Sequence, residues 1–375
     1  MVGLRGTGRR SLIVTPAWVG QDTQAELERR ATAGESPRTD YVELARVLDA
    51  DVMDMQYLTE RAGILTRALA GTGRVVAAQI IEAFLAERRY DHVVTRADRL
   101  GLPLALLFKA ARGRRDVVLV SVWVSRPRKA VFLSHLKVHS HLGAIITYSS
   151  VQRDFAADRL GVPREKLYQC LQPVDERFWR PSDEPVRDVI VSVGAEARDY
   201  PTLVRALDGV DIAAEVAVGS SMLPPSGDAD GLFGPVIREA VDAGSTAKIR
   251  LRQQLSHGEL RQLYARARFV VVPLRDVEFD AGVTAITEAM AMGKAVVVTR
   301  TRGQVDVIRE GESGLYVPPG DPVALRKAVR YLLDNPAAAE RMGSAGRAAV
   351  EARHTLDGWV AAIADVVTRR RSVTR

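Results

Sequence analysis

Two acidic residues stand near the start of one predicted helix, in the stretch DAGVTAITEAMAMGKAVVVTR from Asp280 to Arg300. Asp280 and Glu288 are separated by seven residues, and the small residues Ala281 and Gly282 follow the first acid. The flanking stretches FVVVPL and AVVVTR have the β-branched composition of buried strands, so the helix between them belongs to a βαβ unit. The loop before this helix then lies at the carboxyl edge of a parallel sheet, where open α/β sheets bind their ligands.

The backbone at the start of this helix is suited to an anion, because a helix N-terminus attracts phosphate. Gly282 also lets a ligand approach the backbone closely. Glu288 falls about one turn into the helix, where it could accept hydrogen bonds from a ribose diol. Asp280, at the mouth of the site, could accept from hydroxyls beyond the phosphates. A diphosphate, a diol and further hydroxyls together describe a nucleotide sugar. The expected backbone donors are Ala281, Gly282, Val283 and Thr284.

The elements that must position these residues recur along the whole chain, because short β-branched runs alternate with helical patterns. The expected strands are SLIVT, DVMDM, HVVTR, VVLVSVWVS and AIITYSS in the first half, and DVIVSVG, AAEVAVG, KIRLRQQ, FVVVPL, AVVVTR and GLYVP in the second. The stretch 173–186 is rich in proline and charge, as a linker should be. The pattern predicts two α/β domains with parallel sheets.

The composition bounds the class of protein. A chain of 375 residues exceeds one usual core, and 53 basic against 46 acidic residues give a net charge of +7, which favours anionic partners. The basic clusters are not interleaved with aromatic residues, so we expect no nucleic-acid partner. Solvated faces explain these clusters, and a weak attraction to anionic lipid headgroups is the alternative. No apolar run reaches the roughly 18 residues that span a bilayer, and we expect a cytoplasmic protein, with peripheral association at the inner membrane face left open.

The segment Phe269–Leu315 resembles the donor-binding signature of family 4 retaining glycosyltransferases, the group 1 glycosyl transferases of GT-B fold. That family carries two acids separated by seven residues and followed by Glu-Ala-Met-Ala, and Asp280 and Glu288 occupy the two acidic positions. Aspartate in place of the usual glutamate shortens the reach toward the sugar by one methylene. Arg302 occupies a position that glycine usually holds.

Two further segments support the resemblance. Ser150–Pro181 is similar to the interdomain passage of the family, and HTLDGWVAAIADVV, from His354, is similar to its closing helix. The resemblance implies an α/β chain of GT-B fold, with two Rossmann-like domains whose parallel sheets face each other across a cleft. The C-terminal helix would return to the N-terminal domain. The implied division is 1–182 for the acceptor-binding domain, 183–353 for the nucleotide-sugar-binding domain, and 354–375 for the closing helix and basic tail.

The family also clamps the diphosphate with an arginine and a lysine that follow a glycine at a strand end. Gly194 is present here, but Ala195 and Tyr200 fill the two cationic positions. Arg198 lies between them and is our candidate for the phosphate contact, since a guanidinium can bind two phosphate oxygens at once. The alternative is an ion pair of Arg198 with Asp199 or another surface acid. Further donor-side candidates are Gly20 and Leu255.

The acceptor side is expected in the first domain, at the ends of its strands. TPAWVGQD follows the first strand, and TRADRLG and SVWVSRP end two others. The candidates there are Trp18, Arg96, Asp98, Trp123 and Ser125.

No cofactor or metal is expected. Asp228 and Asp230 form an Asp-x-Asp in a Pro/Gly-rich loop that does not follow a strand, which favours an ordinary turn. His135, His139 and His141 are interpreted as helical surface, because the first two would share one face without a third ligand.

The single cysteine, Cys170, is expected at a buried strand end rather than as a reactive nucleophile.

The resemblance implies a glycosyltransferase of the hexosyltransferase type. It would move a sugar from a nucleotide diphosphate sugar, with UDP or GDP, to a hydroxyl of a glycan, a lipid-linked glycan or a small molecule, with retention of configuration. The departing diphosphate can accept the proton of the acceptor, while the helix N-terminus and Arg198 stabilise its developing charge. The expected catalytic residues are Asp280, Glu288 and Arg198. Two alternatives stay open: a nucleotide-sugar epimerase of the same fold, and a catalytically silent nucleotide-sugar-binding protein.

Overall fold

The computed structural model describes residues 11–17, 22–218 and 245–369. The chain divides into two compact units, and each is described by itself. The first unit comprises 1–28, 39–170 and 359–375, and the second comprises 29–38 and 171–358. The stretch 173–186, expected as a linker, thus lies in the second unit, while the division proposed from the sequence places most of it with the first domain.

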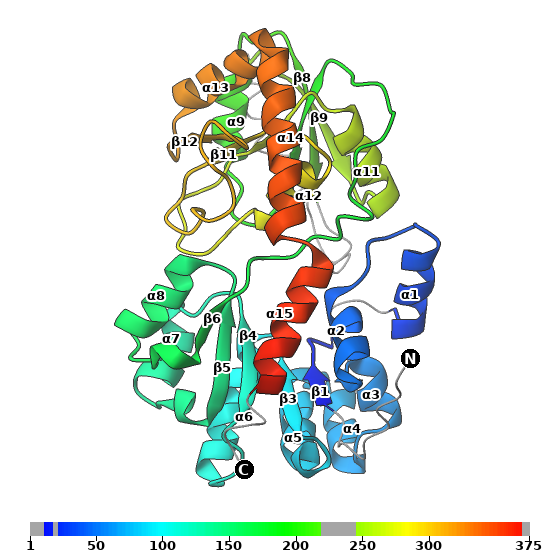
Figure 1. The fold of residues 1–375 in the computed structure, drawn as a ribbon, viewed down its shortest axis with the longest axis vertical. Coiled ribbons are helices and arrows are strands. Elements are labelled where there is room, and N and C mark those ends of the chain that lie inside the picture. Colours follow the sequence, from blue (N-terminus) through cyan, green and yellow to red (C-terminus); the bar gives the residue numbers. More distant parts are fainter. Residues whose placement is uncertain (1–10, 18–21, 219–244, 370–375) are drawn as a thin grey trace. The chain divides into compact units, whose positions relative to one another are not determined.

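The first unit is built on a six-stranded parallel sheet in the order β2-β1-β3-β4-β5-β6 (Figure 1). Its strands are β1 (Ser11–Val14), β2 (Ala50–Met53), β3 (His92–Thr95), β4 (Val117–Ser121), β5 (Leu142–Thr147) and β6 (Leu167–Gln169). Every residue of β4 and of β5 is buried, as expected for a parallel sheet with helices on both faces. In such a sheet the chain reverses its winding between β1 and β3, and ligands bind at that switch point.

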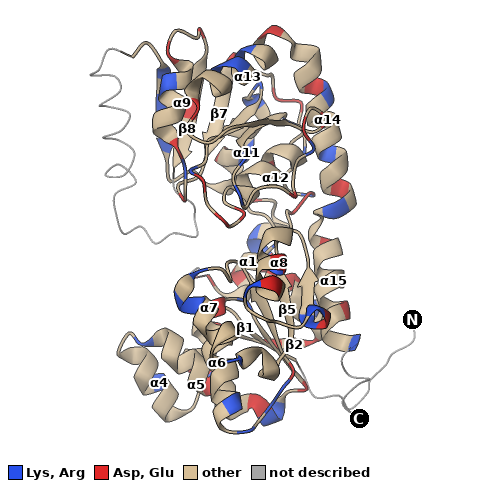
Figure 2. Cartoon of the chain, turned by 90° about the vertical axis from the view of Figure 1, so that its left-hand side faces the viewer, with Lys and Arg blue, Asp and Glu red and all other residues tan. Residues whose placement is uncertain are grey.

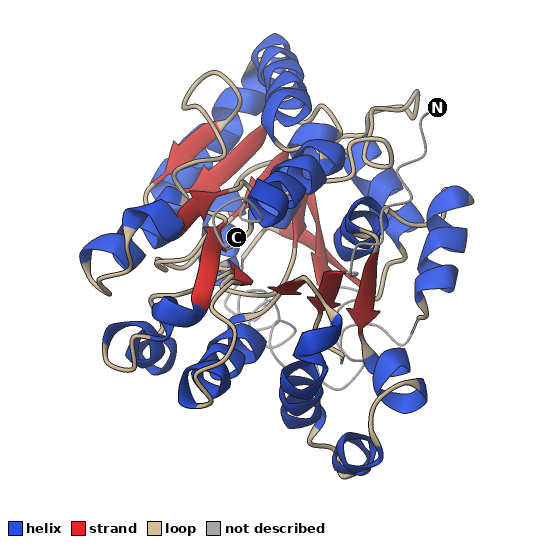
Figure 3. Cartoon of the chain, turned by 60° about the horizontal axis from the view of Figure 1, so that its bottom comes forward, coloured by secondary structure: helices blue, strands red, loops and turns tan. Residues whose placement is uncertain are grey.

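The helices of the first unit connect these strands and cover the sheet (Figure 3). They are α2 (Asp40–Leu48), α3 (Met55–Glu60), α4 (Ile64–Gly71), α5 (Val75–Ala86), α6 (Asp98–Ala110), α7 (Pro127–Ser134) and α8 (Ser150–Asp158), with short 3-10 turns η1 (Glu87–Arg89), η2 (Val138–His141) and η3 (Arg164–Lys166). Two helices are divided between the units: α1 (Gln24–Thr32) and α15 (Leu356–Arg369).

The second unit holds another six-stranded parallel sheet, in the order β12-β11-β10-β7-β8-β9. Its strands are β7 (Val189–Val193), β8 (Ala213–Val218), β9 (Lys248–Gln253), β10 (Val270–Val272), β11 (Val296–Thr299) and β12 (Leu315–Val317). Its helices are α9 (Tyr200–Leu207), α11 (His257–Arg266), α12 (Val283–Ala291), α13 (Pro322–Asp334) and α14 (Pro336–Arg353). This strand order is that of dinucleotide-binding folds, and its switch point lies between β7 and β10.

The expected α/β class and the expected strands are confirmed, and charged residues lie mainly on helices and loops (Figure 2). The short strand β6 was not among the expected strands, although Cys170 was expected at a buried strand end. Cys170 comes directly after β6, is half-buried, and has its thiol pKa raised to about 11 by burial. A thiol with that pKa is a poor nucleophile at neutral pH.

Candidate functional site

The loops after β7 and β10 meet at the switch point of the second sheet. The backbone amide of Asp199 donates to the carbonyl of Pro273 (3.0 Å), and Arg198 pairs with Leu274 in an isolated β-bridge. These contacts bring the segment from Gly194 to Asp199 beside the segment that leads to Asp280. The two segments predicted to hold the donor are therefore neighbours.

Arg198 is buried between two glycines of these segments. Gly194 has φ +107, and a Cβ placed there would collide with the Arg198 guanidinium. Gly282 has φ +79, and its Cβ would lie 2.9 Å from Val272 Cγ1 and 3.4 Å from Arg198 Nη1. Glycine is required at both positions by the left-handed backbone and by the closeness of its neighbours.

The Arg198 guanidinium is held by backbone carbonyls. Its Nε donates to Val193 (2.8 Å) and its Nη1 to Glu196 (2.8 Å), whereas within the described residues Nη2 has no hydrogen-bond acceptor. Burial lowers the pKa of Arg198. The ion pair with Asp199, weighed as the alternative, is wrong, because that carboxylate accepts from the amide of Thr202 and caps α9.

Ala195 and Tyr200, at the two positions where the family usually has cations, both pack in the protein core. Tyr200 is fully buried in the core, and its hydroxyl donates to the carbonyl of Gly194 (2.5 Å). Desolvation raises its pKa to about 12. Ala195 packs against the hydrophobic core of the second unit. Arg198 is therefore the only cation of this turn whose head group lies at the glycine-lined position.

The N-terminus of α12 leaves several amide groups open. The amide of Val283 donates to the carbonyl of Asp280 (3.2 Å). Within the described part of the chain, the amides of Gly282, Thr284 and Ala285 have no acceptor. Thr284 is exposed and Gly282 is half-buried, whereas Ala285 is buried. A helix end with free N–H groups beside a guanidinium is an anion-binding arrangement.

The two acids of the motif have different surroundings. Asp280 is 6% exposed, and desolvation raises its pKa to about 6. It therefore lies deeper than the mouth position expected from the sequence. Glu288 is half-buried, and desolvation raises its pKa to about 8, against the opposing effects of Arg198 and of a hydrogen bond from Tyr264 (3.0 Å).

Three residues near this site were not predicted as site residues from the sequence. Tyr264 comes from α11, and its hydroxyl donates to the Glu288 carboxyl group. Gln304 is fully buried, its Nε2 donates to the carbonyl of Ala281 (2.9 Å), and its Oε1 has no partner among the described residues. Arg302, known only as a departure from the family, binds the carboxylates of Asp276 (3.1 Å) and Glu278 (2.9 Å) on the approach loop. No local pattern marks the first two.

Three of the acceptor-side candidates come together in the first unit, at the carboxyl ends of β3 and β4. The buried Asp98 accepts from Ser121 and from Lys129 (2.7 Å), and the amide of Trp123 lies 3.5 Å from its carboxylate. Trp123 Nε1 donates to Ser125 Oγ (2.9 Å). Two further residues belong to this group. Gln152 accepts from the amide of Ser125 through Oε1 and donates to Ser125 Oγ through Nε2. The guanidinium of Arg126 lies 4.3 Å from the centroid of the Trp123 ring.

Arg96 lies apart from that group. Its guanidinium binds the carboxylate of Asp40 and lies over the rings of Tyr41 (5.6 Å) and Trp359 (5.8 Å). Trp359 belongs to the part of α15 in the first unit, so Arg96 fixes this helix to α2. The strand-end position of Arg96 is confirmed, but its side chain is engaged in packing.

Other candidates are less informative. Trp18, Gly20, Asp228 and Asp230 lie outside the described residues. Leu255 is half-buried in the loop between β9 and α11.

The interpretation of the histidines as one helical surface is wrong, because α7 ends before His135, and His139 and His141 lie in η2. His141 is buried. Within the described ranges no group of three or more His, Cys, Asp or Glu side chains is placed to hold a metal ion.

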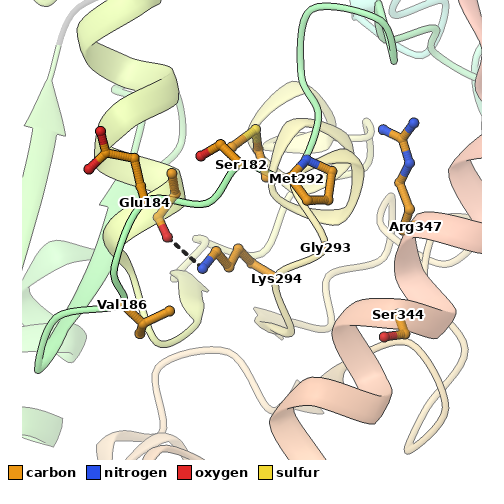
Figure 4. Close-up of a pocket in the computed structure, with 10 residues that line it drawn as sticks. Ser182, Glu184, Val186, Met292, Gly293, Lys294, Ser344 and Arg347 are labelled. Carbon is orange, nitrogen blue, oxygen red and sulfur yellow. Dashed lines mark hydrogen bonds between the residues drawn. The ribbon is translucent and has the colours of Figure 1, made fainter.

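A pocket of about 390 Å³ lies elsewhere in the second unit (Figure 4). It is formed by the segment 181–186 and by Met292, Gly293 and Lys294 at the opposite end of α12 from Gly282. Lys294 donates to the carbonyls of Ala265 (2.7 Å) and Ala267 (2.8 Å), so its ammonium already has partners. This pocket is separate from the glycine-lined site.

Comparison with known structures defines the class of fold. Sucrose-phosphate synthase from Thermosynechococcus elongatus aligns over 98% of this chain and 100% of its own, with a TM-score of 0.71 and 16% identity. HepE from Anabaena, in complex with UDP-glucose, aligns over 96% of this chain and 99% of its own, with a TM-score of 0.67 and 15% identity. These structures are GT-B glycosyltransferases, and the chain has the GT-B fold.

Sequence comparison then matches the donor-side segment to a family model. Residues 234–349 match the model of the family Glycosyl transferases group 1, which confirms the group 1 resemblance noted from Asp280 and Glu288. A D-inositol 3-phosphate glycosyltransferase of Catenulispora acidiphila is 30% identical over 185 residues, which are 49% of this chain and 40% of that enzyme. An MMP alpha-(1->4)-mannosyltransferase of Mycolicibacterium hassiacum is 23% identical over 262 residues, 66% of this chain and 61% of that enzyme. The matches thus span less than two thirds of these relatives.

Proposed function

We propose that this chain is a retaining glycosyltransferase that moves a sugar from a nucleotide diphosphate sugar to a hydroxyl acceptor. The observation that carries the proposal is the position of Arg198, held between Gly194 and Gly282 beside the open amides of α12. The matched family and the names of the relatives support the transferase class.

On the donor side, different residues bind different parts of the nucleotide sugar. Arg198 Nη2 and the amides of Gly282, Thr284 and Ala285 bind the diphosphate, because their hydrogens have no acceptor in the described protein. Glu288, fixed by Tyr264, accepts hydrogen bonds from the ribose diol. Asp280 accepts from hydroxyls of the sugar. UDP is the first nucleotide to test, since the similar fold of HepE is in complex with UDP-glucose.

On the acceptor side, the group of Asp98, Trp123 and Ser125 offers a carboxylate, an aromatic surface and a hydroxyl near one strand edge. Such a set suits a polyhydroxyl compound, whose hydroxyls donate to Asp98 and whose apolar face lies on the indole. The ion pair with Lys129 (2.7 Å) holds the Asp98 carboxylate in place.

The transfer step follows from the stabilisation of the leaving diphosphate. As the bond to the anomeric carbon breaks, negative charge grows on the phosphate oxygens, and Arg198 and the helix amides stabilise it. The departing phosphate oxygen takes the proton of the attacking hydroxyl, and the new bond forms on the same face. Loss of one such contact typically slows the reaction by about a hundredfold.

A thermal-shift screen with UDP, GDP, ADP and their sugars tests the proposal first. A nucleotide at a hundred times its dissociation constant adds about 2.7 kcal/mol to the free energy of unfolding. The nucleotide that binds is then supplied as its sugar with a panel of glycans and polyols, and the product is analysed for its anomeric configuration.

Four results of that experiment have separate meanings. A product with retained configuration supports the proposal. Conversion of the donor sugar without acceptor would favour the epimerase, and binding without any turnover would favour the silent binding protein that Ala195 and Tyr200 leave open. An inverted product would contradict the proposed retention.

A further inference from the structure

The helix pair α4 and α5 of the first unit carries large apolar side chains on its solvent side. Ile64 and Leu65, at the start of α4, are 84% and 85% exposed. On α5, Ile81 and Leu85 are 38% and 65% exposed, four residues apart and therefore on one face. Isolated exposed apolar residues are ordinary, but this number on adjacent helices marks an interaction surface.

A buried acid holds the two helices in register. Glu82 of α5 accepts hydrogen bonds from the hydroxyl of Thr66 (2.6 Å) and from the amide of Gly63 (3.1 Å). The beginning of α4 therefore lies beside the second half of α5. Ile64 and Leu65 thus lie at the same end of the helix pair as Leu85.

The charge on this helix pair is of one sign. Between 61 and 86 the only acidic residue is Glu82, which is buried and hydrogen-bonded. Glu87, directly after α5, is half-buried and lies 3.8 Å from Arg114. Arg67 donates to the carbonyl of Ala62. Within the described residues, Arg74, Arg88 and Arg89 have neither an ion pair nor a hydrogen bond from their side chains. Figure 2 shows α4 and α5 at the outer side of the first unit.

A hollow of about 310 Å³ lies at the same end of the helix pair. It is lined by Asp51, Tyr57, Arg61, Arg89 and Tyr90. Arg61 is bound to Asp51 (3.1 Å), whereas Arg89 retains its full set of donors for a ligand. A phosphate group that enters the hollow would meet this guanidinium.

We propose that this surface, defined as Ile64, Leu65, Ile81, Leu85, Arg67, Arg74, Arg88 and Arg89, docks the protein on a bilayer that contains anionic phospholipid. The apolar side chains enter the interface between headgroups and acyl chains, and the arginines bind lipid phosphates. A second copy of the chain fits less well, because a self-complementary interface would bring unpaired arginines together without an exposed acid in the patch. No helix among the described residues is long and apolar enough to cross the bilayer, so the contact is peripheral.

Co-sedimentation with vesicles tests this inference and needs no sugar donor, so its outcome is independent of the proposed function. The full-length protein is mixed with vesicles of phosphatidylcholine and phosphatidylglycerol, and with vesicles of phosphatidylcholine alone. We expect binding to the first and not to the second. Each arginine near an anionic surface strengthens binding about fivefold, so the double variant Arg88→Gln/Arg89→Gln should bind more than tenfold more weakly and lose about half of its salt dependence.

The double variant Ile64→Ser/Leu65→Ser removes the apolar contact and should lower binding about tenfold. Both residues are exposed, so the melting temperature should stay that of the wild type. The matched control is Val323→Ser/Arg341→Gln, which changes an exposed valine and an exposed arginine of the second unit. Equal sedimentation of all variants, or no binding of the wild type to anionic vesicles, overturns the inference. A dimer that Ile64→Ser/Leu65→Ser converts to a monomer, with vesicle binding unchanged, would assign the surface to self-association instead.

Discussion

The hydroxyl of Tyr264 donates a hydrogen bond to Glu288 across 3.0 Å, from α11 to α12. Tyr264 is fully buried, and its ring packs edge-on against Trp179 with 5.7 Å between the ring centroids. The tyrosine therefore has little freedom, and it fixes the carboxyl group that we assign to the ribose diol. Arg198, which lowers the pKa of the same carboxyl, links this pair to the diphosphate position.

Replacement of Tyr264 with Phe should weaken binding of the nucleotide diphosphate by about tenfold. The ring stays in place, but Glu288 loses the donor that orients it, and a hydrogen bond between neutral groups typically contributes about 0.5 to 1.5 kcal/mol. Titration calorimetry measures the change, with Tyr331→Phe on the exposed side of α13 as the matched control. Equal affinity of the two variants would show that Tyr264 has only a packing role.

The raised pKa of Glu288 predicts a pH dependence of stability. In the folded chain the carboxyl keeps its proton up to about pH 8, whereas an unfolded glutamate releases it near 4.5. Between these values the folded state binds more protons, so the free energy of unfolding should fall as the pH rises. Urea unfolding at several pH values should show a smaller fall for Glu288→Gln than for the wild type. Glu340→Gln, on the exposed side of α14, is the control and should follow the wild type. An identical slope for Glu288→Gln would contradict the burial of this carboxyl.

Gly282→Ala should cost more stability than Gly209→Ala, although both glycines have positive φ, +79 and +71. Each alanine pays about 1–2 kcal/mol for the left-handed backbone. Only at Gly282 does the new Cβ approach Val272 and Leu274, at 2.9 and 3.1 Å, while at Gly209 no atom lies within 4 Å. The extra crowding should add about 1–3 kcal/mol and displace Arg198, so that nucleotide binding is lost in the first variant alone. Similar melting temperatures for the two variants would argue against close packing at the helix start.

Removal of divalent metal should leave most of the activity. The phosphate charge is assigned to Arg198 and to the amides of α12, which need no ion. Transfer assays with and without EDTA check this expectation, with added Mg²⁺ as the reversal step. A complete loss that metal restores would contradict it and would direct attention to Asp228 and Asp230.

Much of the fold could be predicted because it depends on local patterns. Strands of a parallel sheet covered on both faces are continuous apolar runs, and β4, β5 and β7 are fully buried. The strand β6 has three half-buried residues, LYQ, and is too short to give such a signal. The order of the strands, and hence the switch point between β7 and β10, could be determined only from the structure.

The donor motif was accessible for the same reason, since Asp280, Gly282 and Glu288 lie on one stretch of chain. Arg198 was found by analogy with a strand-end glycine, but its burial between two glycines depends on how two loops pack. Tyr264 and Gln304 reach the site from other elements, so no spacing in the sequence marks them. For Arg96, the predicted position at a strand end is correct, but the predicted acceptor role is not supported. Its side chain contacts Asp40 and Trp359, which are both distant in sequence.

The central claim is that Arg198 binds the diphosphate of the donor, and titration calorimetry with the nucleotide identified by the screen tests it most directly. Arg198→Gln should weaken binding by at least about a hundredfold and Arg198→Lys by less, because lysine keeps the charge but not the paired donors. Arg205→Gln, an arginine on the exposed side of α9, should bind as the wild type does. Melting temperatures measured without nucleotide separate lost binding from lost folding. Wild-type affinity in a folded Arg198→Gln variant would contradict the account.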